Sequence, residues 1–115
     1  MSNIWYINAN SASEDGLTPD TGYHNYTNLS TSIVINPDDI VNFVNNGIVD
    51  DSATNTVTIS NGIILQSYTP PFKPNWIPPK EIAVIDATSF NLNNIVLAGT
   101  TTLSINGSIN IYRPS

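Results

Sequence analysis

The residues of this sequence that are best suited to acid–base chemistry are carboxylates, and four of them stand in two adjacent pairs, Asp38-Asp39 and Asp50-Asp51. Two carboxyl groups held about 5 to 9 Å apart can cleave a glycosidic bond, and clustered carboxylates can bind calcium. Both pairs stand in turn-forming segments, where an aspartate more often accepts hydrogen bonds from backbone amides. We therefore predict a turn role for both pairs.

Basic and soft side chains that could complete a catalytic site are scarce. Lys73, Lys80 and Arg113 are the only candidate bases, and none stands near an acidic cluster in the sequence. His24 is the single histidine and there is no cysteine, which excludes a histidine cluster, a thiolate metal site and a disulfide. The sequence thus predicts a protein that is not an enzyme and that has no cofactor and no metal site.

A polar loop near the N-terminus concentrates oxygen-bearing side chains. Residues 11–21 (SASEDGLTPDT) combine Gly, Pro, Asp and Ser, which favours turns. The oxygen ligands of a weak calcium site could come from Asn8, Asn10, Glu14, Asp15 and Asp20. The spacing does not fit an EF-hand loop, so we expect these side chains to cap the loop backbone instead.

Aromatic side chains are the best binding candidates. Phe72 and Trp76 lie in residues 69–80 (TPPFKPNWIPPK), where five prolines in twelve residues stiffen the chain. A stiff loop presents its side chains to a partner with little loss of entropy, but the same two residues could instead fold back and cover the protein. Candidates for stacking on a sugar are Trp5, Tyr6, Tyr23 and Tyr26.

Composition limits the class of protein. The 115 residues (1–115) are enough for one domain. The net charge of −6 disfavours nucleic acid as a partner. No apolar stretch is long enough to span a membrane, and the first residues lack the pattern of a signal peptide. Hydrophobic residues make up 40% of the chain, which is enough for a core.

The elements that must position these side chains are short strands. Helix-favouring residues are scarce and β-branched residues are abundant. Residues 4–8 form a first strand, and residues 1–30 comprise this strand and the polar loop. The other expected strands are 32–35, 39–44, 56–59, 63–66, 82–85, 95–97, 103–105 and 109–112. Several are continuous apolar runs, which favour stacked parallel strands in a solenoid over a β-sandwich or jelly roll.

Proline gives residues 69–80 a separate role in this scheme. A proline has no backbone N–H to donate to a sheet, so this segment is not expected to form a central strand. We expect it to be an excursion between two coils of the solenoid.

The order of segments resembles the opening of the pectate-lyase-like right-handed parallel β-helix superfamily. Many of its members begin with an aromatic strand and a Gly/Ser/Asp loop, which residues 5–8 (WYIN) and 15–23 (DGLTPDTGY) match in order and spacing. Residues 37–41 (PDDIV) are similar to the family's Pro-Gly-Asp entry to a strand, with Asp38 in place of glycine. The family often has a capping helix between these motifs, but residues 24–35 are β-branched and polar and do not predict it.

The resemblance implies a short right-handed parallel β-helix, and 115 residues allow three or four coils of about 20–25 residues. It also implies a structural role like that of phage tailspikes and other virion surface proteins, outside the cell and without a signal peptide, after a cytoplasmic stage before assembly. The alternatives are a glycan-binding adhesin-type module and the remnant of a polysaccharide lyase or hydrolase.

Association is expected because a short solenoid leaves its terminal coils without a neighbour. The expected partner is a second copy of this chain, with a trimer as the first expectation by resemblance, or another virion protein. Candidate contact residues are those of the aromatic excursion and of the apolar C-terminal run, namely Phe72, Trp76, Ile105, Ile109, Ile111 and Tyr112.

Overall fold

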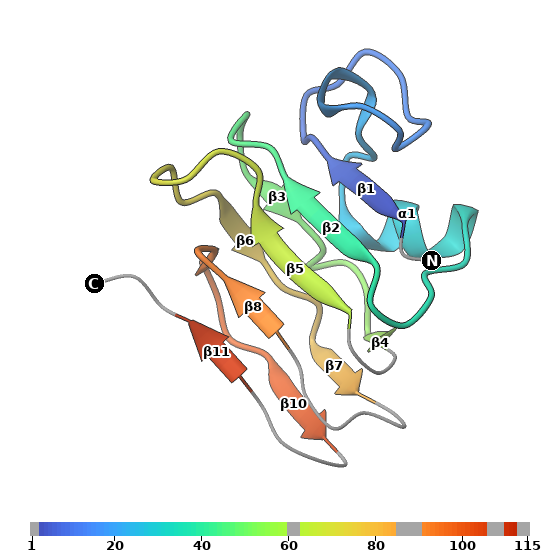
Figure 1. Ribbon diagram of the computed structural model, residues 1–115. Helices are drawn as coiled ribbons and strands as arrows, with labels where there is room; N and C mark the ends of the chain where they lie inside the picture. The colour runs from blue at the N-terminus through green and yellow to red at the C-terminus, as the bar shows by residue number, and fades with distance from the viewer. Residues whose placement is uncertain (1–2, 60–62, 85–90, 106–109, 113–115) are drawn as a thin grey trace.

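The computed structural model describes residues 3–59, 63–84, 91–105 and 110–112. Within these ranges the chain forms short strands in three sheets, with one short α-helix and one turn of 3-10 helix at Pro19–Thr21 (Figure 1). All strand pairings are parallel. The all-β class with parallel sheets is therefore confirmed, and the alternative of an antiparallel sandwich or jelly roll is wrong.

The largest sheet, called the main sheet below, has five strands in the order β1-β2-β5-β8-β11. Their bounds are Ile4–Ile7, Ile40–Phe43, Ile64–Ser67, Asn91–Asn93 and Asn110–Tyr112. The two smaller sheets have three strands each. One, in the order β3-β6-β9, comprises Val49–Asp50, Asn75–Ile77 and Val96–Leu97. The other, in the order β4-β7-β10, comprises Thr56–Ile59, Glu81–Val84 and Thr102–Ile105.

From β2 onward the chain visits the three sheets in rotation, so each round of the chain lies beside the previous one. On the main sheet, Val41 pairs with Leu65, and Leu65 pairs with Leu92. These three side chains are buried, while the positions that directly follow them hold the polar residues Asn42, Gln66 and Asn93. The apolar core therefore runs along the inside of the three sheets, because successive side chains of a strand point to opposite faces.

Helix α1 (Tyr26–Ser32) corrects two expectations, the absence of a capping helix and a strand at residues 32–35. The Asn25 side chain accepts a hydrogen bond from the Asn28 backbone N–H and caps the helix. Tyr26 and Leu29, three positions apart, bury one face. A good cap and one apolar face offset the low helix propensity of the remaining residues.

Residues 69–80 correct a third expectation. This segment contains β6, which lies between β3 and β9 and is thus a central strand. Prolines 74 and 78 flank the three residues of β6 but none stands inside it, so the strand keeps its backbone donors. The sequence reading also missed β3 and β8, each of three residues or fewer.

The two ends of the strand stack differ. At the N-terminal end, α1 lies close to β1, and the polar loop joins them (Figure 1). There the polar loop hydrogen-bonds to β1 and the Asn25 side chain to β3, which leaves the edge of β4 open. At the other end, all three edge strands, β9, β10 and β11, lack a second partner among the residues that the structure describes.

Candidate functional site

The buried carboxylate of Asp51 joins three separate segments and has a structural role. It is 1% exposed. Its Oδ1 accepts hydrogen bonds from the backbone N–H and the hydroxyl of Thr27, at 2.8 and 2.6 Å. Its Oδ2 accepts from the Tyr26 backbone N–H at 3.2 Å and from the Trp76 indole N–H at 2.6 Å. The carboxylate therefore fixes the start of α1 against β6.

Asp39 has a similar role at the start of β2. Its carboxylate accepts hydrogen bonds from the backbone N–H groups of Asn3 and Asn36, at 2.7 and 2.8 Å, and from the Trp5 indole N–H at 3.3 Å. The side chain is fully buried. We call these two buried carboxylates, Asp39 and Asp51, the hubs. At each hub, one aspartate oxygen accepts a hydrogen bond from the indole N–H of a tryptophan on a neighbouring coil.

The other member of each aspartate pair, Asp38 or Asp50, is exposed and takes no part in the hubs. Asp38 has a φ of 70°, a left-handed conformation that favours glycine and that aspartate tolerates. Asp50 Oδ1 accepts a hydrogen bond from the Ser52 backbone N–H, and hydrogen bonding by the side chain and backbone of Ser52 lowers the pKa of Asp50. In each pair one carboxylate is buried and the other is exposed. The two carboxylates of a pair therefore do not face a common substrate atom.

Three of the side chains considered for calcium, those of Asn8, Glu14 and Asp15, accept hydrogen bonds that hold the polar loop. Asn8 Oδ1 accepts from the Asn10 backbone N–H and the Asn46 side chain, at 3.0 and 2.9 Å. Asp15 Oδ1 accepts from the backbone N–H of Leu17 and the hydroxyl of Thr21, at 2.9 and 2.6 Å. Asp20 is exposed. Within the described part of the chain, no three acidic or histidine side chains group as metal ligands.

Glu14 joins the polar loop to α1. Its carboxylate accepts hydrogen bonds from the backbone N–H of His24 and from the side chain of Asn28, both at 3.0 Å, and lies 3.2 Å from His24 Nδ1. The backbone hydrogen bond from His24 is the main cause that holds the pKa of Glu14 below its ordinary value. His24 Nε2 also lies 2.9 Å from the carbonyl oxygen of Ser11. The single histidine is therefore part of the loop.

The aromatic candidates divide into buried and accessible groups. Trp76 is 0% exposed and packs on Phe43, with ring centroids 5.4 Å apart. Its predicted role in contacting a partner is wrong, because β6 turns it into the core. Tyr23 and Tyr26 are also buried, so their prediction as sugar platforms is wrong too.

Trp5, Tyr6 and Phe72 stay accessible, with Phe72 57% exposed. Of the apolar C-terminal candidates, Ile105 pairs in register with Val84, Ile111 with Leu92 and Tyr112 with Asn93. Ile109 lies outside the described residues.

A polar row crosses the outer face of the main sheet. The outer row, as we call it, consists of Tyr6, Asn42, Gln66 and Asn93, which are paired in register on four adjacent strands. The Gln66 side chain donates a hydrogen bond to the Asn42 side-chain oxygen at 2.9 Å. Tyr68 packs edge-on against Tyr6 with ring centroids 5.4 Å apart. The row was not recognised in the sequence because its members are separated by tens of residues.

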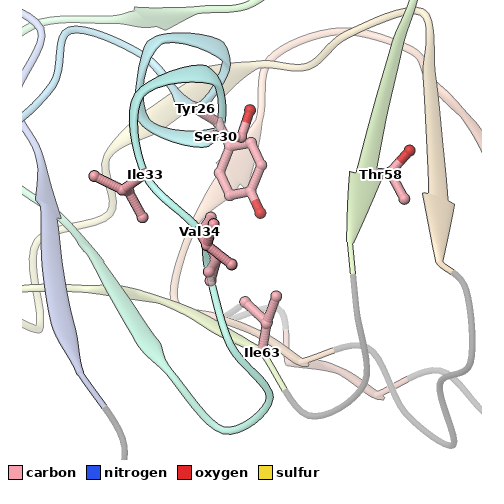
Figure 2. A pocket seen from close by; sticks show the side chains of 7 residues that line it. Tyr26, Ser30, Ile33, Val34, Thr58 and Ile63 are labelled. Carbon is pink, nitrogen blue, oxygen red and sulfur yellow. The ribbon is translucent and has the colours of Figure 1, made fainter.

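A cavity of about 230 Å³ lies between α1, the segment that follows it and the free edge of β4 (Figure 2). It is lined by Tyr26, Ser30, Ile33, Val34, Ile35, Thr58 and Ile63. Figure 2 shows the ring of Tyr26 extending from α1 toward Val34 and Ile63. Its hydroxyl is buried and has no hydrogen-bond partner among the residues that the structure describes. Burial, and then the charge of Asp51, raise the pKa of Tyr26.

Comparison of the chain with family models, with curated proteins and with solved structures found no match. Among the described residues, no helix is both long and apolar enough to cross a membrane.

Proposed function

We propose that this chain is a non-catalytic structural module, a short right-handed parallel β-helix that self-associates through its uncovered coil end. The observation that supports the proposal is the difference between the two ends of the strand stack. The N-terminal end is covered over two of its three edge strands, whereas all three edge strands at the other end are open among the described residues, which suits a unit that joins a partner on one side.

A right-handed β-helix is the arrangement that best fits the observed strand order. The chain passes through three parallel sheets in rotation, and each strand of a sheet is joined to the next by a crossover connection. Crossovers between parallel strands of one sheet are right-handed in about 98% of cases. Short rounds with inward apolar side chains are also typical of solenoids.

The open edges offer both hydrogen-bonding groups and apolar surface. The unpaired side of an edge strand pairs readily with another chain. On β9, Val96 is 39% exposed and Leu97 is partly exposed, and Leu103 on β10 is partly exposed as well. With only 10% charged residues, repulsion between copies is modest and is screened within about 8 Å at physiological salt.

The resemblance suggests the setting. A trimer, or incorporation into a larger virion assembly at the particle surface, is the first arrangement to examine. Phe72 is 57% exposed, and its carbonyl accepts a hydrogen bond from Ser67 at the C-terminal end of β5, so its ring is available for such a contact.

The experiment is a mass measurement by sedimentation or light scattering at tens of micromolar. We expect an oligomer that Val96→Lys dissociates, because a charge on an edge strand opposes pairing. Ile48→Lys is the matched control, since Ile48 is 55% exposed and precedes β3 near the covered end. A wild-type monomer at this concentration, or equal effects of the two variants, would refute the proposal.

The outer row favours a second candidate function, the binding of a neutral glycan. Side-chain amides can exchange hydrogen bonds with sugar hydroxyls, and the faces of Tyr6 and Tyr68 can stack on sugar rings. The net charge of −6 disfavours an acidic polysaccharide. Titration with neutral oligosaccharides, observed by NMR, should shift the side-chain amide of Gln66, which is more accessible than the buried Asn42. Tyr68→Ala should weaken this binding and Leu17→Ala, an exposed change in the polar loop, should not.

A further inference from the structure

The cavity at α1 contains an unpaired hydrogen-bonding group at its inner end. Tyr26 and Ile63 are buried, whereas Val34 is 76% exposed and Thr58 is exposed, so the cavity opens between Val34 and Thr58. The Tyr26 hydroxyl has no hydrogen-bond partner in the described part of the chain. A buried hydroxyl without a partner destabilises a fold. A molecule in the cavity that accepts its hydrogen bond would remove this penalty.

The lining defines the chemistry of that molecule. Because the pKa of Tyr26 is raised, its hydroxyl keeps its proton at neutral pH and can donate. The walls are the aliphatic side chains of Ile33, Ile35 and Ile63, and no lining side chain is charged. A neutral ligand is favoured, since a charged one would lose hydration without a counter-charge.

We propose that this cavity is a binding site for a small neutral molecule with a compact apolar body and one oxygen that accepts a hydrogen bond from Tyr26 Oη. The apolar body lies against the isoleucines, and the molecule enters past Val34 and Thr58. The site is separate from the uncovered coil end and from the outer row, so it does not depend on either proposed function.

Cyclohexanone is a suitable probe, because it combines a compact apolar ring with one acceptor oxygen. We expect it to shift the NMR methyl signals of Ile33, Val34 and Ile63. Tyr26→Phe keeps the ring and removes only the hydroxyl, so it should fold at least as stably as the wild type and bind cyclohexanone about threefold to tenfold more weakly. Val34→Trp, at the exposed mouth, should block binding while circular dichroism shows an intact fold.

Cyclohexylammonium tests the requirement for a neutral ligand and should leave the same signals unmoved. The proposal is wrong if cyclohexanone at tens of millimolar moves none of these methyl signals, which would mean that the cavity takes water only. Equal affinity of the wild type and Tyr26→Phe would also overturn it. Binding of cyclohexylammonium as tight as that of cyclohexanone would do the same.

Discussion

Replacing Asp51 by asparagine tests the central structural argument, that one buried carboxylate holds α1 against β6. The substitution preserves the size of the side chain and removes its charge. It leaves a single acceptor oxygen where the carboxylate offered two. Each oxygen of Asp51 accepts two hydrogen bonds, from the backbone and hydroxyl of Thr27 on one side and from Tyr26 and Trp76 on the other.

The expected loss follows from these contacts. If the amide N–H₂ of asparagine faces Tyr26 and Trp76, two N–H donors lose their acceptor. If it faces Thr27 instead, the hydroxyl can reverse its role but the backbone N–H cannot. A hydrogen bond to a charged group contributes about 1.5 to 3 kcal/mol, and a buried donor left unpaired adds its desolvation cost. We therefore expect Asp51→Asn to lower the free energy of unfolding by about 3 to 5 kcal/mol.

Urea denaturation followed by tryptophan fluorescence measures this loss, because Trp76 is both buried and bonded to Asp51. In a thermal melt the same loss corresponds to a decrease of about 10 to 20 °C. Asp50→Asn is the matched control, since its side chain is exposed and accepts from Ser52 within its own turn. If the two variants unfold at the same urea concentration, the hub does not hold α1 in place and the reasoning fails.

Three further predictions use the same assays. Glu14 has a lowered pKa, so its contribution to stability is present above the ordinary value of 4.5 and is lost as the pH falls through the lower folded-state value. Glu14→Gln should therefore reduce the decrease in melting temperature between pH 5 and pH 3. Gly22→Ala should destabilise strongly, because its Cβ would lie 2.7 Å from a backbone nitrogen, whereas Gly99→Ala, whose Cβ would be 3.4 Å from its nearest neighbour, should melt near the wild type. Leu65→Ala should lower the free energy of unfolding by about 2 to 5 kcal/mol, and an equal effect of Gln66→Ala, on the outward face, would contradict the inward assignment of Leu65.

Much of the strand framework is predictable from the sequence. The apolar runs around β2, β4, β5 and β7 mark strands because β-branched residues in short runs pack well on a sheet. The continuous apolar run at residues 63–65, at the start of β5, favours parallel pairing, which the structure has. The turn role expected for the aspartate pairs agrees with the local hydrogen bonds from Asn36 to Asp39 and from Ser52 to Asp50, whereas Asp51 bonds to residues of other segments.

What the sequence does not show is which residues from different coils meet. Trp76 stands among prolines and looks like an exposed loop residue, yet β6 places it between β3 and β9, where its indole bonds to Asp51. Helix α1 forms in a segment of low helix propensity, in part because Asp51, 24 positions away from Thr27, accepts hydrogen bonds at its first turn.

The type of secondary structure, the parallel pairing and the scarcity of groups for catalysis can all be predicted from the amino-acid sequence. These properties depend on residue type and on spacing over a few positions. The tertiary structure alone decided the helical cap, the burial of Trp76, the outer row and the cavity beside Tyr26. Each of these depends on register between strands about one coil apart, and that register is set by the packing of the whole core rather than by any local pattern.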